Sequence, residues 1–95
     1  MNRRYVVSYT GVYYINVDMI VSIEDSKRDS KRDLLIEDVN SNTFAVFSGS
    51  EDQVKFVLDK LIKWICDSDD SIFYIKDAHK QYVDAIAESE RYKEQ

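Results

Sequence analysis

Residues 33–66 read "DLLIEDVNSNTFAVFSGSEDQVKFVLDKLIKWIC", and the hydrophobic period changes inside this stretch. "DLLIEDV" (33–39) and "TFAVFS" (43–48) are rich in β-branched and aromatic residues, which favour strands. The "NSN" between them tolerates left-handed backbone conformations, so we predict a hairpin. From residue 54 the apolar residues recur every three or four positions, which predicts a helix over 51–66. Its apolar positions are Val54, Val57, Leu58, Leu61, Ile62 and Ile65.

The start of this helix carries a capping signal. Ser50 is followed three residues later by Gln53, the spacing of a capping box, in which each side chain bonds the backbone amide of the other residue. Glu51 and Asp52 place negative charge at the positive end of the helix dipole. We therefore expect the helix to begin at Glu51.

The residues before this stretch predict further strands. "YVVSY" (5–9) and "VYYI" (12–15) flank a "TG" turn signal and read as a hairpin. In 19–25 apolar and polar residues alternate in part, which is typical of a strand with one drier face. Tyr5, Val7 and Tyr9 can share one sheet face, which leaves two partly apolar faces to be covered, and a dimer could cover one of the two. The residues proposed for the opposite face are Tyr13, Ile15 and Leu35.

After the helix, "DSDDS" (67–71) acts as a break. A second apolar stripe predicts another helix that runs to about Arg91, although a short strand over 72–75 is an open alternative. The stripe consists of Ile72, Ile75, His79, Tyr82 and Ile86. We predict one α+β domain over 1–95, strand-rich over 1–48 and helical over 50–92: an antiparallel sheet of about five strands, followed by two C-terminal helices packed on one or both faces.

The most basic segment is "SKRDSKRD" (26–33), which falls between two predicted strands. We predict a solvated loop there, because its polar residues interrupt the apolar pattern on both sides. The loop lacks the aromatic or Gly residues that usually accompany cations in a nucleic-acid finger, so direct nucleic-acid binding is a disfavoured alternative. Its candidate contact residues are Lys27, Arg28, Lys31 and Arg32.

Composition restricts the partners further. The chain has 95 residues and a net charge of −5, from 18 acidic and 13 basic side chains. This balance opposes general affinity for DNA or an anionic membrane surface. One cysteine, Cys66, cannot form a disulfide within the chain and points to a reducing compartment. No apolar run is long enough to span a membrane and no signal peptide is expected, so we predict a cytoplasmic protein.

Catalytic residues are scarce. His79 is the only histidine and lies on the apolar side of the second predicted helix, where a packing role is expected. Cys66 ends a helix, and that end of the helix dipole does not activate a thiol. Gly11 and Gly49 are isolated, which excludes a glycine-rich phosphate loop, and "DSDD" lacks the Gly and Glu of a calcium loop. We expect no enzymatic activity, no cofactor and no metal.

The remaining candidates lie on the predicted surface, where carboxylates and aromatic rings would contact a protein partner. The predicted partner-binding carboxylates are Asp67, Asp69, Asp70, Asp77, Glu37 and Asp38. Phe56 and Trp64 fall outside the main apolar stripe of the first helix, about two turns apart. Either the second helix packs over them, or they form an aromatic anchor at an interface.

The segment 14–65 ("YYINVDMIVSIED", then "LLIED", "TFAVFS" and a capped helix) resembles the small flagellar-operon FlbD-like proteins in its order of elements, without the Gly-containing turns of that family. The short, acidic, Tyr-rich chain also resembles phage inhibitors of host defence systems. Our first hypothesis is therefore a non-enzymatic inhibitor, of phage or mobile-element origin, whose carboxylates take the place of phosphates on a nucleic-acid-binding host protein. The alternative is an FlbD-like regulatory or structural module that dimerises, and direct nucleic-acid binding through 26–33 comes third.

Overall fold

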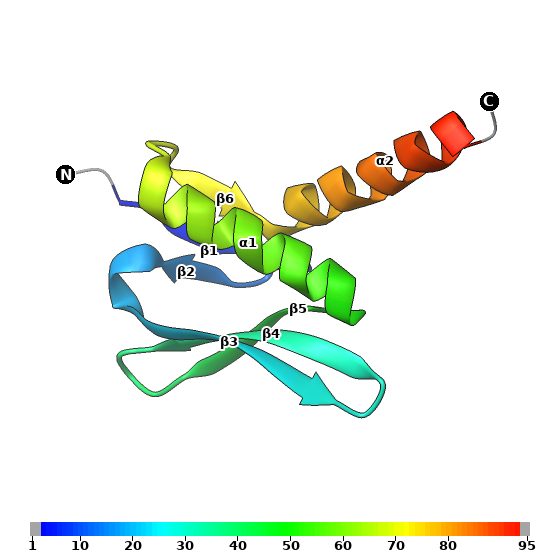
Figure 1. Cartoon of the computed structure of the whole chain (residues 1–95). Coiled ribbons are helices and arrows are strands. Elements are labelled where there is room, and N and C mark those ends of the chain that lie inside the picture. The colour runs from blue at the N-terminus through cyan, green and yellow to red at the C-terminus, as the bar shows by residue number, and fades with distance from the viewer. Residues whose placement is uncertain (1–2, 94–95) are drawn as a thin grey trace.

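The computed structural model describes residues 3–93, with side chains described as far as Arg91 (Figure 1). Its elements follow one another in the order β1 (Tyr5–Val7), β2 (Tyr14–Asn16), the 3-10 turn η1 (Val17–Met19), β3 (Ile20–Arg28), β4 (Lys31–Asp38), β5 (Thr43–Gly49), α1 (Glu51–Asp67), β6 (Ile72–Tyr74) and α2 (Ile75–Lys93). The predicted hairpins and the first helix are confirmed, and the α+β class with them.

The strands form two sheets rather than one. The first sheet has the order β2-β1-β6, and β6 runs parallel to β1; the second sheet is the antiparallel meander β3-β4-β5. The prediction of about five antiparallel strands followed only by helices is therefore wrong in part, because α1 lies between β5 and β6. Over so short a run, periodicity cannot separate a strand from a helix. The Tyr5 amide donates to the Ser71 carbonyl oxygen and begins this distant pairing.

The predicted loop over 26–33 is also wrong. β3 continues to Arg28 and β4 begins at Lys31, so only Asp29 and Ser30 form the turn, with Asp29 at a φ of 54°. The charged residues belong to a projecting hairpin, and their polarity reflects exposure on its strands. Lys27 lies opposite Arg32, a like-charge pair that would be unfavourable alone. An ion pair between Arg32 and Asp25 offsets this repulsion, and Arg28 next to Lys27 pairs with Asp33.

The other two turns agree with the sequence. Gly11 has a φ of 78° in the β1–β2 connection, although the strands there are shorter than predicted. Ser41 has a φ of 65° in the β4–β5 turn, where the Asp38 carboxylate accepts hydrogen bonds from the Asn40 and Asn42 amides. A side chain that replaces backbone partners in this way fixes a tight turn.

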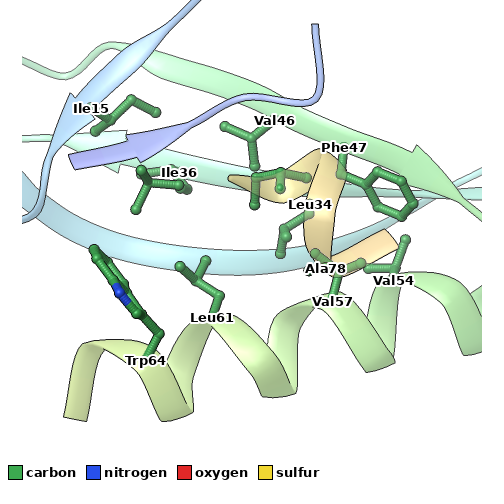
Figure 2. Packing of buried hydrophobic residues seen from close by; sticks show 12 residues of the cluster. Ile15, Leu34, Ile36, Val46, Phe47, Val54, Val57, Leu61, Trp64 and Ala78 are labelled. Carbon is green, nitrogen blue, oxygen red and sulfur yellow. The ribbon is translucent and has the colours of Figure 1, made fainter. Parts of the chain in front are cut away.

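The core lies between α1 and the two sheets (Figure 2). The capping box is present: Ser50 Oγ accepts from the Gln53 amide at 3.2 Å, and Gln53 Oε1 accepts from the Ser50 amide at 2.9 Å. The buried face of α1 consists of Val54, Val57, Leu61 and Trp64. Trp64 is thus part of the stripe, whereas the predicted stripe residue Ile62 is exposed.

An irregularity in β5 adds side chains to this core. The β4–β5 register shifts between Leu34 and Leu35, which leaves Val46 as an extra residue opposite β4. Such a bulge disturbs the strict alternation of side chains. Val46 and Phe47 are consequently both buried, although they are neighbours in the chain.

The second helix packs on the body only at its beginning. Ile75 and Ala78 are buried, and Phe56 of α1 contacts Tyr82 with ring centroids 5.3 Å apart. From residue 83 to residue 91 every side chain is exposed, and the helix projects away from the rest of the fold (Figure 1). No helix in the described chain is long and apolar enough to cross a membrane.

Candidate protein-binding surface

The predicted carboxylates lie at three separate places. Asp67 ends α1, and Asp69 and Asp70 follow it in the connection to β6; all three are exposed. Asp77 is exposed in the first turn of α2. Glu37 and Asp38 lie at the end of β4. Hydrogen bonds from the Asn42 amide first, and then from the Asn42 side chain and the Asn40 amide, hold the pKa of Asp38 below its usual range. Asp38 therefore stabilises the β4–β5 turn.

Arg4, for which the sequence predicted no role, contacts the segment that contains Asp67, Asp69 and Asp70. The Arg4 guanidinium donates to the carbonyl oxygens of Trp64 at 2.7 Å, Ile65 at 3.1 Å and Ser68 at 2.9 Å. It also lies 4.3 Å from the Trp64 ring centroid. A cation is favourable at this negative end of α1, where Arg4 adds a charged donor to the Trp64 carbonyl, which also accepts from the Ser68 amide. Arg4 also donates to the Asp70 carbonyl oxygen, in the connection that follows α1.

The two predicted aromatic anchors pack inside the chain. Trp64 is 7% exposed and its ring centroid lies 5.4 Å from that of Phe73, so Trp64 is a core residue rather than an exposed anchor. Phe56 is half-buried under Tyr82, with Lys60 Nζ 5.4 Å from its ring centroid. The second helix covers Phe56, as the packing interpretation expected.

The four cations of the β3–β4 hairpin differ in their surroundings. Lys27 and Lys31 are exposed, whereas Arg28 pairs with Asp33 at 2.9 Å. Arg32 lies 3.3 Å from Asp25 and 3.5 Å from Glu51. The Ser48 hydroxyl first, and then Arg28, hold the pKa of Asp33 below its usual range. The two arginines thus contribute to the hairpin itself.

The outer side of the first sheet is aromatic. Val6, Ile15 and Phe73 are cross-strand neighbours and belong to the core beneath α1. Side chains alternate along a strand, so the residues on either side of these three face the opposite way. We call this opposite side the tyrosine face; it consists of Tyr5, Val7, Tyr14, Asn16, Ile72 and Tyr74.

The tyrosine face has one buried residue at its centre. Val7 is only 2% exposed, yet it lies outside the core cluster beneath α1. Its cross-strand neighbours are Tyr14 and Tyr74, which are 59% and 44% exposed. Two half-exposed rings therefore flank a buried valine, and Ile72 extends the apolar surface beside them. Within residues 3–91, no helix covers this face.

A hollow of about 360 Å³ lies at the edge of β5, beside the β1–β2 connection. Tyr9, Phe47 and His79 line it, and their ring centroids are 5.2 to 5.8 Å apart, so the rings pack mainly on one another. His79 has the packing environment that the sequence indicated. Among the residues whose side chains are described, no group of three or more His, Cys, Asp or Glu is placed to hold a metal ion.

Comparisons with protein-family models, with curated proteins and with solved structures found no match. The resemblance to the FlbD-like proteins therefore remains an interpretation of the order of elements.

Proposed function

We propose that this chain is a non-enzymatic protein-binding module and that the tyrosine face is its binding surface. The observation that supports this proposal is the exposure of Tyr14, Ile72 and Tyr74 around the buried Val7 on a sheet face without a covering helix in the described chain. A sheet that packs one face on the core usually presents polar residues on the other. Here the outer face is mostly aromatic and aliphatic.

The chemistry of the face suits protein recognition. Contiguous apolar surface of this kind marks interaction sites in proteins that otherwise remain dispersed in water. Tyrosine is enriched at the energetic centres of interfaces, because its ring buries a large area and its hydroxyl keeps a polar contact. A partner that covers Tyr14 and Tyr74 would remove apolar area from water at roughly 25 cal/mol per Å² before the cost of association.

The proposal can be tested by photo-cross-linking in cells that produce the protein. A photoreactive phenylalanine analogue replaces Tyr14 in one variant and Tyr74 in another, and Ser30 at the tip of the β3–β4 hairpin in a control. We expect protein adducts from the two face positions and few from Ser30. Adducts from all three positions alike, or from none, would contradict the proposal.

A second candidate is charge mimicry, in which the chain inhibits a nucleic-acid-binding protein. The exposure of Asp67, Asp69 and Asp70 at the end of α1 favours it. Binding of this kind should slow sharply on association as salt rises, because long-range attraction between charges is screened. Changing the three residues together to Asn should abolish such binding. Loss of binding in a Tyr14→Ser/Tyr74→Ser variant alone would favour the tyrosine face instead.

A further inference from the structure

We propose that the tyrosine face is covered by the distal half of α2 from a second copy of the chain, so that two copies exchange these helices around a twofold axis. This inference rests on the proposed function, because it takes the tyrosine face to be the binding surface. It adds the identity of the partner and the element that the partner contributes.

The chain's own α2 cannot cover the face. No residue separates Tyr74, the last residue of β6, from Ile75, the first residue of α2. A helix without a connecting loop cannot reverse over the sheet that it leaves. Ile75 and Ala78 are buried in the core beneath α1, which places the first half of α2 on the side opposite the tyrosine face. The remainder of the helix then projects outward (Figure 1).

The distal half of α2 has an apolar stripe without a partner in the described chain. Val83 and Ile86 are 47% and 44% exposed, and they continue the face that Tyr82 begins. Glu88 lies on the other side of this segment, and Glu90, which falls between Val83 and Ile86 in helical projection, ends the stripe. A helical segment that contacts nothing is only marginally stable in water. Docking its stripe on an apolar surface would stabilise it.

The tyrosine face and the stripe of Val83 and Ile86 both expose apolar side chains, so each can cover the other. Sheet faces in α+β folds are usually covered by amphipathic helices, and in the described chain both the tyrosine face and the stripe of Val83 and Ile86 are exposed. In a twofold arrangement each copy gives its helix and receives the other, which closes the assembly at two copies. A one-way contact would instead leave one face exposed at one end of the pair and one stripe exposed at the other.

The available area fits a dimer and not a single contact. A half-exposed aromatic side chain offers on the order of 100 Å², so the face offers roughly 400 Å². One helix on one face would bury about twice that, below the roughly 1,200 Å² of a standard stable interface. The twofold exchange doubles the contact and brings it into that range. Reciprocity is therefore what makes the assembly stable.

Cysteine cross-linking between differently labelled chains tests the arrangement. The single cysteine is first removed as Cys66→Ser. One chain then carries Tyr14→Cys on the face, and a second, differently tagged chain carries Ile86→Cys on the helix. We expect the mixture to form a disulfide between the two tags faster than either chain alone forms one with itself. Val83→Cys with Tyr74→Cys repeats the test if either first variant fails to fold, and Ser30→Cys serves as the control.

The outcomes separate the inference from the function on which it rests. Disulfides only between two Tyr14→Cys chains would mean sheet-to-sheet pairing, and only between two Ile86→Cys chains would mean helix-to-helix pairing; either result overturns the exchange. A chain that sediments as a monomer at every concentration also overturns it. If such a monomer still gives photo-adducts with another protein from Tyr14 and Tyr74, the protein-binding function stands and only the self-association fails. If those adducts are absent too, both proposals fail.

Discussion

At the scale of single residues, Arg4 joins parts of the chain that the sequence separates by about 60 positions. Its hydrogen bonds to the last turn of α1 hold β1 and the end of the helix together. Its guanidinium also lies over the Trp64 ring. This contact depends on long-range folding, so no local pattern in the sequence indicates it.

Replacing Arg4 should therefore lower stability. We expect Arg4→Met to reduce the free energy of unfolding by about 1–3 kcal/mol, because partly buried carbonyl oxygens lose a charged donor. Arg3→Met is the matched control, since Arg3 is exposed one residue earlier, and its effect should be within about 0.5 kcal/mol. Urea unfolding of both variants measures this difference. Equal effects would mean that the Arg4 contacts contribute nothing specific.

Asp33 should make the β3–β4 hairpin sensitive to acid. Its pKa in the folded chain lies below the ordinary value of 3.8, with the Ser48 hydroxyl as the main cause and Arg28 next. A carboxyl whose pKa falls on folding contributes stability above its unfolded pKa, and this contribution is lost as the pH falls through the folded pKa. NMR titration of the Asp33 carboxyl should show the lowered pKa, and Ser48→Ala should raise it. A titration unchanged by Ser48→Ala would contradict this assignment.

At the scale of elements, α1 is where sequence and structure agree best. The capping box and the helical period are local signals, so they predicted both the start of α1 and its length. Within the stripe, neighbours differ sharply: Leu61 is fully buried and Ile62 is 44% exposed. The sequence pattern leaves Trp64 off the main stripe, because that stripe runs through Ile62 and Ile65. The completed sheets bury the side of α1 that carries Trp64.

This difference gives a direct test of the packing of α1. Leu61→Ala should cost about 2–5 kcal/mol of unfolding free energy through lost contacts and a cavity. Ile62→Ala, one residue later, should cost less than about 1 kcal/mol, since its side chain is largely hydrated already. Chemical denaturation of the two variants provides the comparison. A larger cost at Ile62 would mean that α1 is rotated relative to the described arrangement.

Unlike α1, the distal half of α2 buries no described side chain against the rest of the fold. Truncation after Val83 should leave the free energy of unfolding of dilute protein, measured with urea, within about 0.5 kcal/mol of that of the full chain, since the removed side chains up to Arg91 are exposed. The same truncation should abolish concentration-dependent association in sedimentation experiments. A large loss of stability in dilute solution would show that this segment packs on its own chain.

At the scale of the whole molecule, the limits of the sequence follow from distance along the chain. The hairpins and α1 were predictable because turns, caps and periods act over a few residues. The parallel pairing of β1 with β6 joins residues about 67 positions apart, and no local signal specifies it. The alternation of Tyr5 and Val7 did indicate a shared face. Only β6 and the position of α1 show that this face points outward and includes Tyr74.

The same distance effect explains the outcome for the candidate site. The carboxylates were chosen from the composition of short segments, and the structure places them at the ends of different elements. The tyrosine face, by contrast, is assembled from three strands that lie far apart in the sequence. Its residues become one surface only after the first sheet has formed.

We propose that the chain associates through the tyrosine face and not through its carboxylates. Sedimentation equilibrium of the full chain, in low and in high salt, tests it most directly alongside the Tyr14→Ser/Tyr74→Ser and Asp67→Asn/Asp69→Asn/Asp70→Asn variants. We predict an association that salt changes little, that survives the three aspartate substitutions and that is lost with the two tyrosines. An association that disappears in high salt and persists without the tyrosines would contradict the account.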